Sequence, residues 1–73
     1  MISFDEALKK ARELKSNIDY CIEYNDAWLF GCRDEFHVIG ATPVIVLKEN
    51  GKAIDAVTYY DNYDAEELGE IDI

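Results

Sequence analysis

The sequence predicts an α+β domain in which an N-terminal helix packs on a four-stranded antiparallel meander sheet, cystatin-like in outline. Three observations predict it: an amphipathic segment opens the chain, apolar segments typical of strands follow, and turn signals separate these segments. The 73 residues are 49% hydrophobic, which suffices for one core and is too much for a disordered chain. We expect a single domain, with residues 1–60 as its helix-plus-sheet part and residues 61–73 as its acidic C-terminal segment.

Residues 4–15 are predicted to form the helix. Ser3 precedes Glu6 by three positions, which is the spacing of a capping box. Apolar residues then recur at helical spacing, namely Phe4, Ala7, Leu8, Ala11 and Leu14. Ser16 and Asn17 are expected to end the helix.

Four strands are expected after the helix, at residues 18–24, 27–32, 44–47 and 53–60. Asn25-Asp26 is a plausible two-residue turn between the first two strands, and Asn50-Gly51 is a strong hairpin signal between the last two. Weaker signals predict three further segments. Residues 33–35 are expected to form a polar loop, residues 36–39 a short strand or part of the same loop, and residues 64–68 one helical turn.

These turns also predict which residues share a face of the sheet. One face, which we assign to the helix, gathers Tyr20, Ile22, Leu29, Ile45, Leu47 and Ile54. The opposite face gathers Trp28, Phe30, Val44, Val46 and Val57 and is then apolar and uncovered. Soluble monomers seldom leave such a face open. We expect either the C-terminal residues or another protein chain to cover it, in the second case with Trp28 and Phe30 as anchors.

Charge restricts the partners of this chain. It has 16 acidic and 7 basic residues and a net charge of −9, and residues 61–73 contain six acids and no base. This balance disfavours binding to nucleic acids and to anionic membranes. The acidic segment is either solvated charge that aids solubility or a negative surface for a basic protein. No apolar run approaches the roughly 20 residues that span a bilayer, and no signal peptide is apparent, so we expect a cytoplasmic protein.

Few residues have the spacing of a reactive site. Cys21, Cys32 and His37 match no zinc-binding pattern, and the two cysteines are expected to lie diagonally, about 7–8 Å apart, which is too far for an unstrained disulfide. We expect them to be reduced core residues. No phosphate-binding glycine loop and no cofactor motif occurs, so neither metal nor cofactor is expected. A small enzyme using Cys32 or His37 remains an alternative.

Tyrosines stand beside the acids near the C-terminus. They either cover the core at a strand end or form a contact surface for a basic protein, because tyrosine offers contact area at a low entropy cost. Acids on such a surface would neutralise a basic site or imitate nucleic-acid phosphates. The predicted partner-binding residues are Trp28, Phe30, Tyr59, Tyr60, Asp61, Tyr63, Asp64, Glu66, Glu67 and Glu70.

The order of motifs resembles the small YrhB-type immunity domains of bacterial polymorphic-toxin systems. The helix is followed by Trp28-Leu29-Phe30, then by Gly40-Ala41-Thr42-Pro43-Val44-Ile45-Val46, and then by Asn50-Gly51. The likeness covers residues 3–58 and implies a bacterial cytoplasmic protein that binds and blocks a cognate toxin. The acidic end after Tyr60 lies outside it and is expected to be the partner-specific part. We therefore expect a non-enzymatic immunity protein; the alternative is a small homodimeric structural or accessory protein that assembles through the uncovered sheet face.

Overall fold

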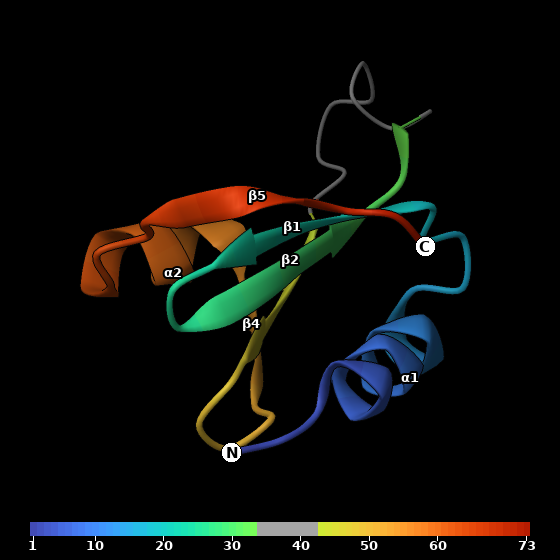
Figure 1. Ribbon diagram of the computed structural model, residues 1–73, viewed down its shortest axis with the longest axis horizontal. Coiled ribbons are helices and arrows are strands. Elements are labelled where there is room, and N and C mark those ends of the chain that lie inside the picture. Colours follow the sequence, from blue (N-terminus) through green and yellow to red (C-terminus); the bar gives the residue numbers. More distant parts are fainter. Residues whose placement is uncertain (34–42) are drawn as a thin grey trace.

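The computed structural model describes residues 1–33 and 43–73 (Figure 1). In chain order the elements are α1 (Phe4–Leu14), β1 (Tyr20–Tyr24), β2 (Ala27–Gly31), β3 (Val44–Leu47), β4 (Ala53–Asp55), α2 (Ala56–Asn62) and β5 (Glu67–Ile71). The strands form one antiparallel sheet in the order β4-β3-β2-β1-β5. The predicted α+β class with an antiparallel sheet is confirmed, but the sheet has five strands rather than four.

Helix α1 forms where its capping box and periodicity predict it. The Glu6 N–H donates to Ser3 Oγ and the Ser3 hydroxyl donates to Glu6 Oε1, both at 3.2 Å, so two polar groups are satisfied at the helix start. Ala7 and Ala11 are fully buried. Because these side chains are small, the helix axis lies close to the sheet.

The predicted register of β1 and β2 is confirmed, with Cys21 opposite Phe30 and Ile22 opposite Leu29. The β3–β4 register differs from the prediction by two residues, since Ile54 lies opposite Ile45 instead of Leu47. The cause is a four-residue loop, 48–51, in place of the predicted two-residue turn. Gly51, at φ +72°, closes it by donating its N–H to the Leu47 carbonyl at 2.8 Å. A two-residue shift leaves each side chain of β3 and β4 on its predicted face, because side chains alternate with a period of two. Val57, predicted for the face of Trp28, instead lies in α2 and is exposed.

The predicted position of the helix is wrong. Helix α1 covers the face of Trp28, Phe30 and Val46, which was expected to be uncovered. The Phe4 ring packs against the rings of Trp28 and Phe30, with centroids 5.8 and 5.9 Å away. The eleven-residue α1 thus covers the face that carries Trp28 and Phe30. The apolar face on which the homodimer alternative depended is therefore occupied.

The other face, with Tyr20, Tyr24, Leu29 and Ile45, is covered in part by Tyr59 from α2. The two helices lie well apart in Figure 1, and their core contacts are on different faces of the sheet. The chain therefore forms three layers, with the sheet in the middle.

The chain after β4 also differs from the prediction. The expected strand 53–60 ends at Asp55, whose carboxylate accepts the Thr58 N–H at 2.6 Å and caps α2. The expected helical turn 64–68 is instead the approach to β5 and its first residues. Ala65 takes a left-handed conformation, φ 54°, in the connection between α2 and β5. Strand β5 then pairs with β1, and this adds the fifth strand.

Some expectations fall outside the described residues: most of the polar loop 33–35, the short strand 36–39, His37 and the Gly40–Thr42 part of the motif. Neither helix in the described ranges has the length and apolar character needed to cross a membrane.

Candidate protein-binding surface

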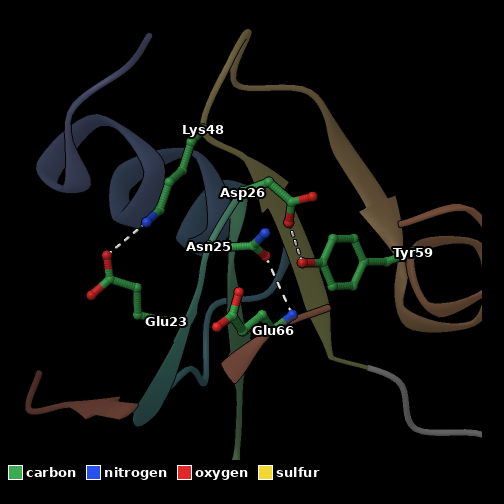
Figure 2. Close-up of polar contacts among 6 residues, drawn as sticks. All are labelled: Glu23, Asn25, Asp26, Lys48, Tyr59 and Glu66. Atoms are coloured by element: carbon green, nitrogen blue, oxygen red, sulfur yellow. Dashed lines mark hydrogen bonds and ion pairs between the residues drawn. The ribbon is translucent and has the colours of Figure 1, made fainter. Parts of the chain in front are cut away.

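The acidic C-terminal segment is packed onto the sheet through α2 and β5. The Asn25 N–H donates to the Glu66 carbonyl at 2.9 Å, and the Glu66 N–H donates to Asn25 Oδ1 at 3.3 Å (Figure 2). Beyond this point β5 continues the pairing, with Ile22 opposite Glu70 and Cys21 opposite Ile71. The carboxylates of this segment are therefore carried by elements with defined positions.

A cluster of tyrosines attaches α2 to the sheet. Tyr59 is fully buried, and its hydroxyl donates to the Asp26 carboxylate in the β1–β2 turn (Figure 2). Its ring lies 5.4 Å from the Tyr24 ring and stacks on Tyr63 at 5.2 Å. The Tyr24 and Tyr60 hydroxyls form a hydrogen bond at 2.7 Å. Because these contacts come from one turn, one strand and one helix, they fix the orientation of α2.

The environment of this cluster keeps two phenols protonated. Burial raises the pKa of Tyr59 above its ordinary value, and the hydrogen bond to Asp26 raises it further. Burial also raises the pKa of Tyr24, with a further contribution from the hydrogen bond to Tyr60. Both side chains are therefore neutral hydrogen-bonding groups at neutral pH.

These shifts predict that the fold loses stability in alkali. The pKa values of Tyr24 and Tyr59 are raised above 10.0, and burial raises the pKa of the Cys21 thiol from 9.0 to about 12. The unfolded chain therefore loses these protons at a lower pH than the folded chain does. The stabilisation is fully present below pH 9, decreases as the pH rises past 9 and 10, and is lost as the folded-state pKa values are passed.

Urea unfolding followed by circular dichroism between pH 7 and 11 measures this effect. We expect a midpoint that falls above pH 9, and a shallower fall in Tyr59→Phe than in the exposed control Tyr63→Phe. A midpoint that rises between pH 9 and 11 would contradict the assignment.

Most of the predicted binding residues are exposed side chains of α2, of β5 or of the connection between them. We define the α2–β5 surface as the exposed side chains of α2, of the connection after it and of β5. It contains Tyr60, Asp61, Tyr63, Asp64, Glu66, Glu67, Leu68 and Glu70. Tyr60 and Tyr63 are 50% and 40% exposed, so both rings offer apolar area beside the carboxylates.

Three of the predicted binding residues do not lie on this surface. Trp28 and Phe30 are buried under α1, on the opposite face of the sheet. Tyr59 is buried beneath α2. These side chains support the fold and present no contact area to a partner in this structure.

Two exposed apolar residues of this surface are absent from the predicted binding residues, Val57 in α2 at 67% exposed and Leu68 in β5. Leu68 is 57% exposed and lies in β5 between Glu67 and Gly69. The available signal was a lone apolar residue within an acidic run, which is typical of the apolar centre of a charged surface.

The charge of the α2–β5 surface is largely uncompensated. Arg33 Nη2 lies 2.7 Å from Glu70 Oε2 and neutralises one carboxylate. Within residues 1–33 and 43–73, no ion pair engages the other four acids of the surface, which are Asp61, Asp64, Glu66 and Glu67. Four of the seven basic residues lie on or directly after α1, namely Lys9, Lys10, Arg12 and Lys15. Because α1 also carries Asp5, Glu6 and Glu13, the helix is of mixed charge, whereas residues 61–73 contain acids alone.

The environment of the Cys21 thiol disfavours its nucleophilic form. Cys21 and Cys32 are both free and buried. The raised pKa of Cys21 disfavours its thiolate at neutral pH, and the thiolate is the nucleophilic form. In the described part of the chain, no three metal-binding side chains gather in one place.

Comparison of the chain with family models, with curated proteins and with solved structures found no match. The likeness to YrhB-type immunity domains thus stays a prediction. The functional conclusion below depends on the geometry and charge of the α2–β5 surface.

Proposed function

We propose that this chain is a non-enzymatic protein-binding domain whose α2–β5 surface engages a basic surface of another protein. One observation carries the proposal: four carboxylates without ion pairs among the described residues share α2, β5 and the connection between them with the half-exposed Tyr60 and Tyr63. A segment that served only solubility would not need to pair with β1 or to cap its helix. Here the backbone of the segment is hydrogen-bonded to the sheet.

The chemistry of the surface suits protein recognition. Tyr60 and Tyr63 supply exposed aromatic area, and aromatic residues are enriched at the centres of interfaces. The surface carboxylates would accelerate the encounter with a basic partner and select against acidic ones. Binding energy and selectivity would thus come from different side chains of the same surface.

The resemblance favours a toxin as the partner. In that case the chain is a bacterial, cytoplasmic immunity protein with the cystatin-like outline that the sequence predicts. It would block the toxin by covering a basic site, with its carboxylates occupying positions that the phosphates of a nucleic-acid substrate would otherwise take. No catalytic residue and no cofactor is required.

Affinity capture from the native host tests this proposal. The tagged chain is compared with Asp61→Asn/Asp64→Asn and with a matched control, Asp5→Asn/Glu13→Gln, which removes the same charge from α1. We expect one partner, retained by the wild type and by the control at low salt, reduced for the α2–β5 variant, and released at high salt. Recovery of the 8.4 kDa chain alone, or of a partner insensitive to both variants and to salt, would contradict the proposal.

A further inference from the structure

Next to the α2–β5 surface, a pocket of about 310 Å³ opens at one end of the sheet. Its walls come from the β1–β2 turn with Asp26, from Leu47 and Glu49 at the end of β3, and from Tyr63 after α2. These segments are distant in sequence. The Lys48 N–H donates to the Asp26 carbonyl at 3.0 Å, and the Tyr63 ring stacks on Tyr59, whose hydroxyl donates to Asp26. The volume is at the lower end of the range for small-molecule sites, roughly 300–1,000 Å³, and suits a single side chain.

Two carboxylates give this pocket its charge. The Asp26 carboxylate accepts a hydrogen bond from the Tyr59 hydroxyl through Oδ1, which holds it in place and leaves Oδ2 without a hydrogen-bond partner among the described residues. Glu49 is exposed, and within residues 1–33 and 43–73 no hydrogen bond or ion pair engages its side chain. The Tyr63 ring also lines the pocket, and its stacking on Tyr59 holds it in place.

The lysine of the pocket wall does not neutralise this charge. Lys48 Nζ lies 2.6 Å from Glu23 Oε2 and 5.2 Å from the centroid of the Trp28 ring. Figure 2 shows its side chain extending to Glu23, away from the Asp26 carboxylate. Its ammonium is thus already paired on the α1 side of the sheet. Met1 also lines the pocket, but within residues 1–33 and 43–73 no ion pair joins its ammonium to Asp26 or Glu49.

We propose that this pocket receives an arginine side chain of the basic partner. The inference deepens the proposed function and rests on it, because the partner supplies the arginine. A guanidinium is planar and less strongly hydrated than an ammonium, so it can stack on Tyr63 while donating to Asp26 and Glu49. The methylenes of an arginine would lie along Leu47.

Titration of the chain with capped amino acids, followed by NMR of its backbone amides, tests the pocket without the partner. The probes are N-acetylarginine methylamide, the corresponding lysine and norleucine derivatives, and free arginine. We expect the capped arginine to shift the amides of residues 25–26, 47–49 and 63, with the lysine probe binding several-fold more weakly and the norleucine probe not measurably.

Three substitutions assign the binding to named groups. We expect Glu49→Gln and Tyr63→Leu each to weaken the arginine probe roughly threefold, since an exposed ion pair and an exposed cation–π contact are each worth up to about 1 kcal/mol. Asp26→Asn still accepts the Tyr59 hydroxyl, so it removes the charge while the loop stays in place. Glu13→Gln on α1 is the matched control and should leave affinity unchanged.

Several results would overturn the inference. Equal binding of norleucine would show a merely apolar pocket, and tighter binding of free arginine would show a small-molecule site. Equal weakening by Glu13→Gln would show nonspecific attraction. Failure of the proposed function itself is distinguishable, because arginine would then still bind while Asp61→Asn/Asp64→Asn left partner capture unchanged. If instead Glu49→Gln leaves partner affinity intact while Asp61→Asn/Asp64→Asn lowers it, the surface is correct and the pocket is not its arginine site.

Discussion

Trp28→Ala is expected to destabilise the fold by about 3–5 kcal/mol, the usual cost of truncating a buried aromatic side chain. Trp28 is 6% exposed, packs edge-on against Phe4 and lies beneath the Lys48 ammonium. Its loss would remove both the packing surface for α1 and the aromatic contact of Lys48. A domain of this size has a total stability of about 4–11 kcal/mol, so the variant would be partly unfolded.

Urea unfolding monitored by far-ultraviolet circular dichroism measures this loss. Leu14→Ala is a suitable control. Leu14 lies in α1 but is 62% exposed, so its truncation should lower the free energy of unfolding by less than about 1 kcal/mol. Trp28→Phe should retain most of the stability. If Trp28→Ala were as stable as the wild type but failed to bind the partner, Trp28 would be an interface anchor and its place in the core would be refuted.

Tyr59→Ala is expected to cost a similar amount, about 3–5 kcal/mol, and to detach α2 from the sheet. Tyr59 is the buried residue of α2, and its ring contacts Tyr24, Tyr60 and Tyr63. Without this ring, a seven-residue helix has too little support to persist. The variant should therefore lose partner binding together with α2.

Tyr59→Phe distinguishes the contribution of the ring to stability from that of the hydroxyl. It keeps the packing and loses the hydrogen bond to Asp26, so we expect a loss of about 1–2 kcal/mol with α2 still in place. Hydrogen exchange of the α2 amides distinguishes the two variants, because only Tyr59→Ala should abolish protection. Unchanged protection of α2 in Tyr59→Ala would contradict the role given to this ring.

The local features of the fold were predictable from short-range signals. The capping box at Ser3 predicted the start of α1, and alternating side chains around Asn25-Asp26 predicted the β1–β2 register. The membership of each sheet face also followed from alternation, which survived the two-residue error in the β3–β4 register.

The position of α1 could not be predicted in the same way. Both faces of the sheet are apolar, and nothing local distinguishes the face of Trp28 from that of Leu29. Residues 56–60 were assigned to a strand because Val57, Thr58 and the tyrosines have high strand propensity. The Asp55 cap and the burial of Tyr59 override this propensity, since tertiary packing outweighs differences of a few tenths of a kcal/mol per residue.

In the candidate surface too, features that depend on local sequence could be predicted, whereas features that depend on tertiary packing could not. The absence of basic residues after Lys52 predicted an acidic segment, and Tyr60 and Tyr63 are exposed within it. Trp28 was assigned to an interface because large aromatics are frequent in both interfaces and cores, and only the position of α1 decides between the two. The pocket lay beyond sequence reasoning, since Asp26, Glu49 and Tyr63 meet only after the sheet has formed.

The most direct test of the central claim is the association rate constant of the captured partner, measured by stopped flow as a function of ionic strength. For Asp61→Asn/Asp64→Asn we expect association roughly threefold to tenfold slower at low ionic strength, with the difference disappearing at high salt. The matched control Asp5→Asn/Glu13→Gln should associate as the wild type does. Equal rates for the wild type and the α2–β5 variant, or equal slowing in both variants, would contradict the claim that this surface meets the partner.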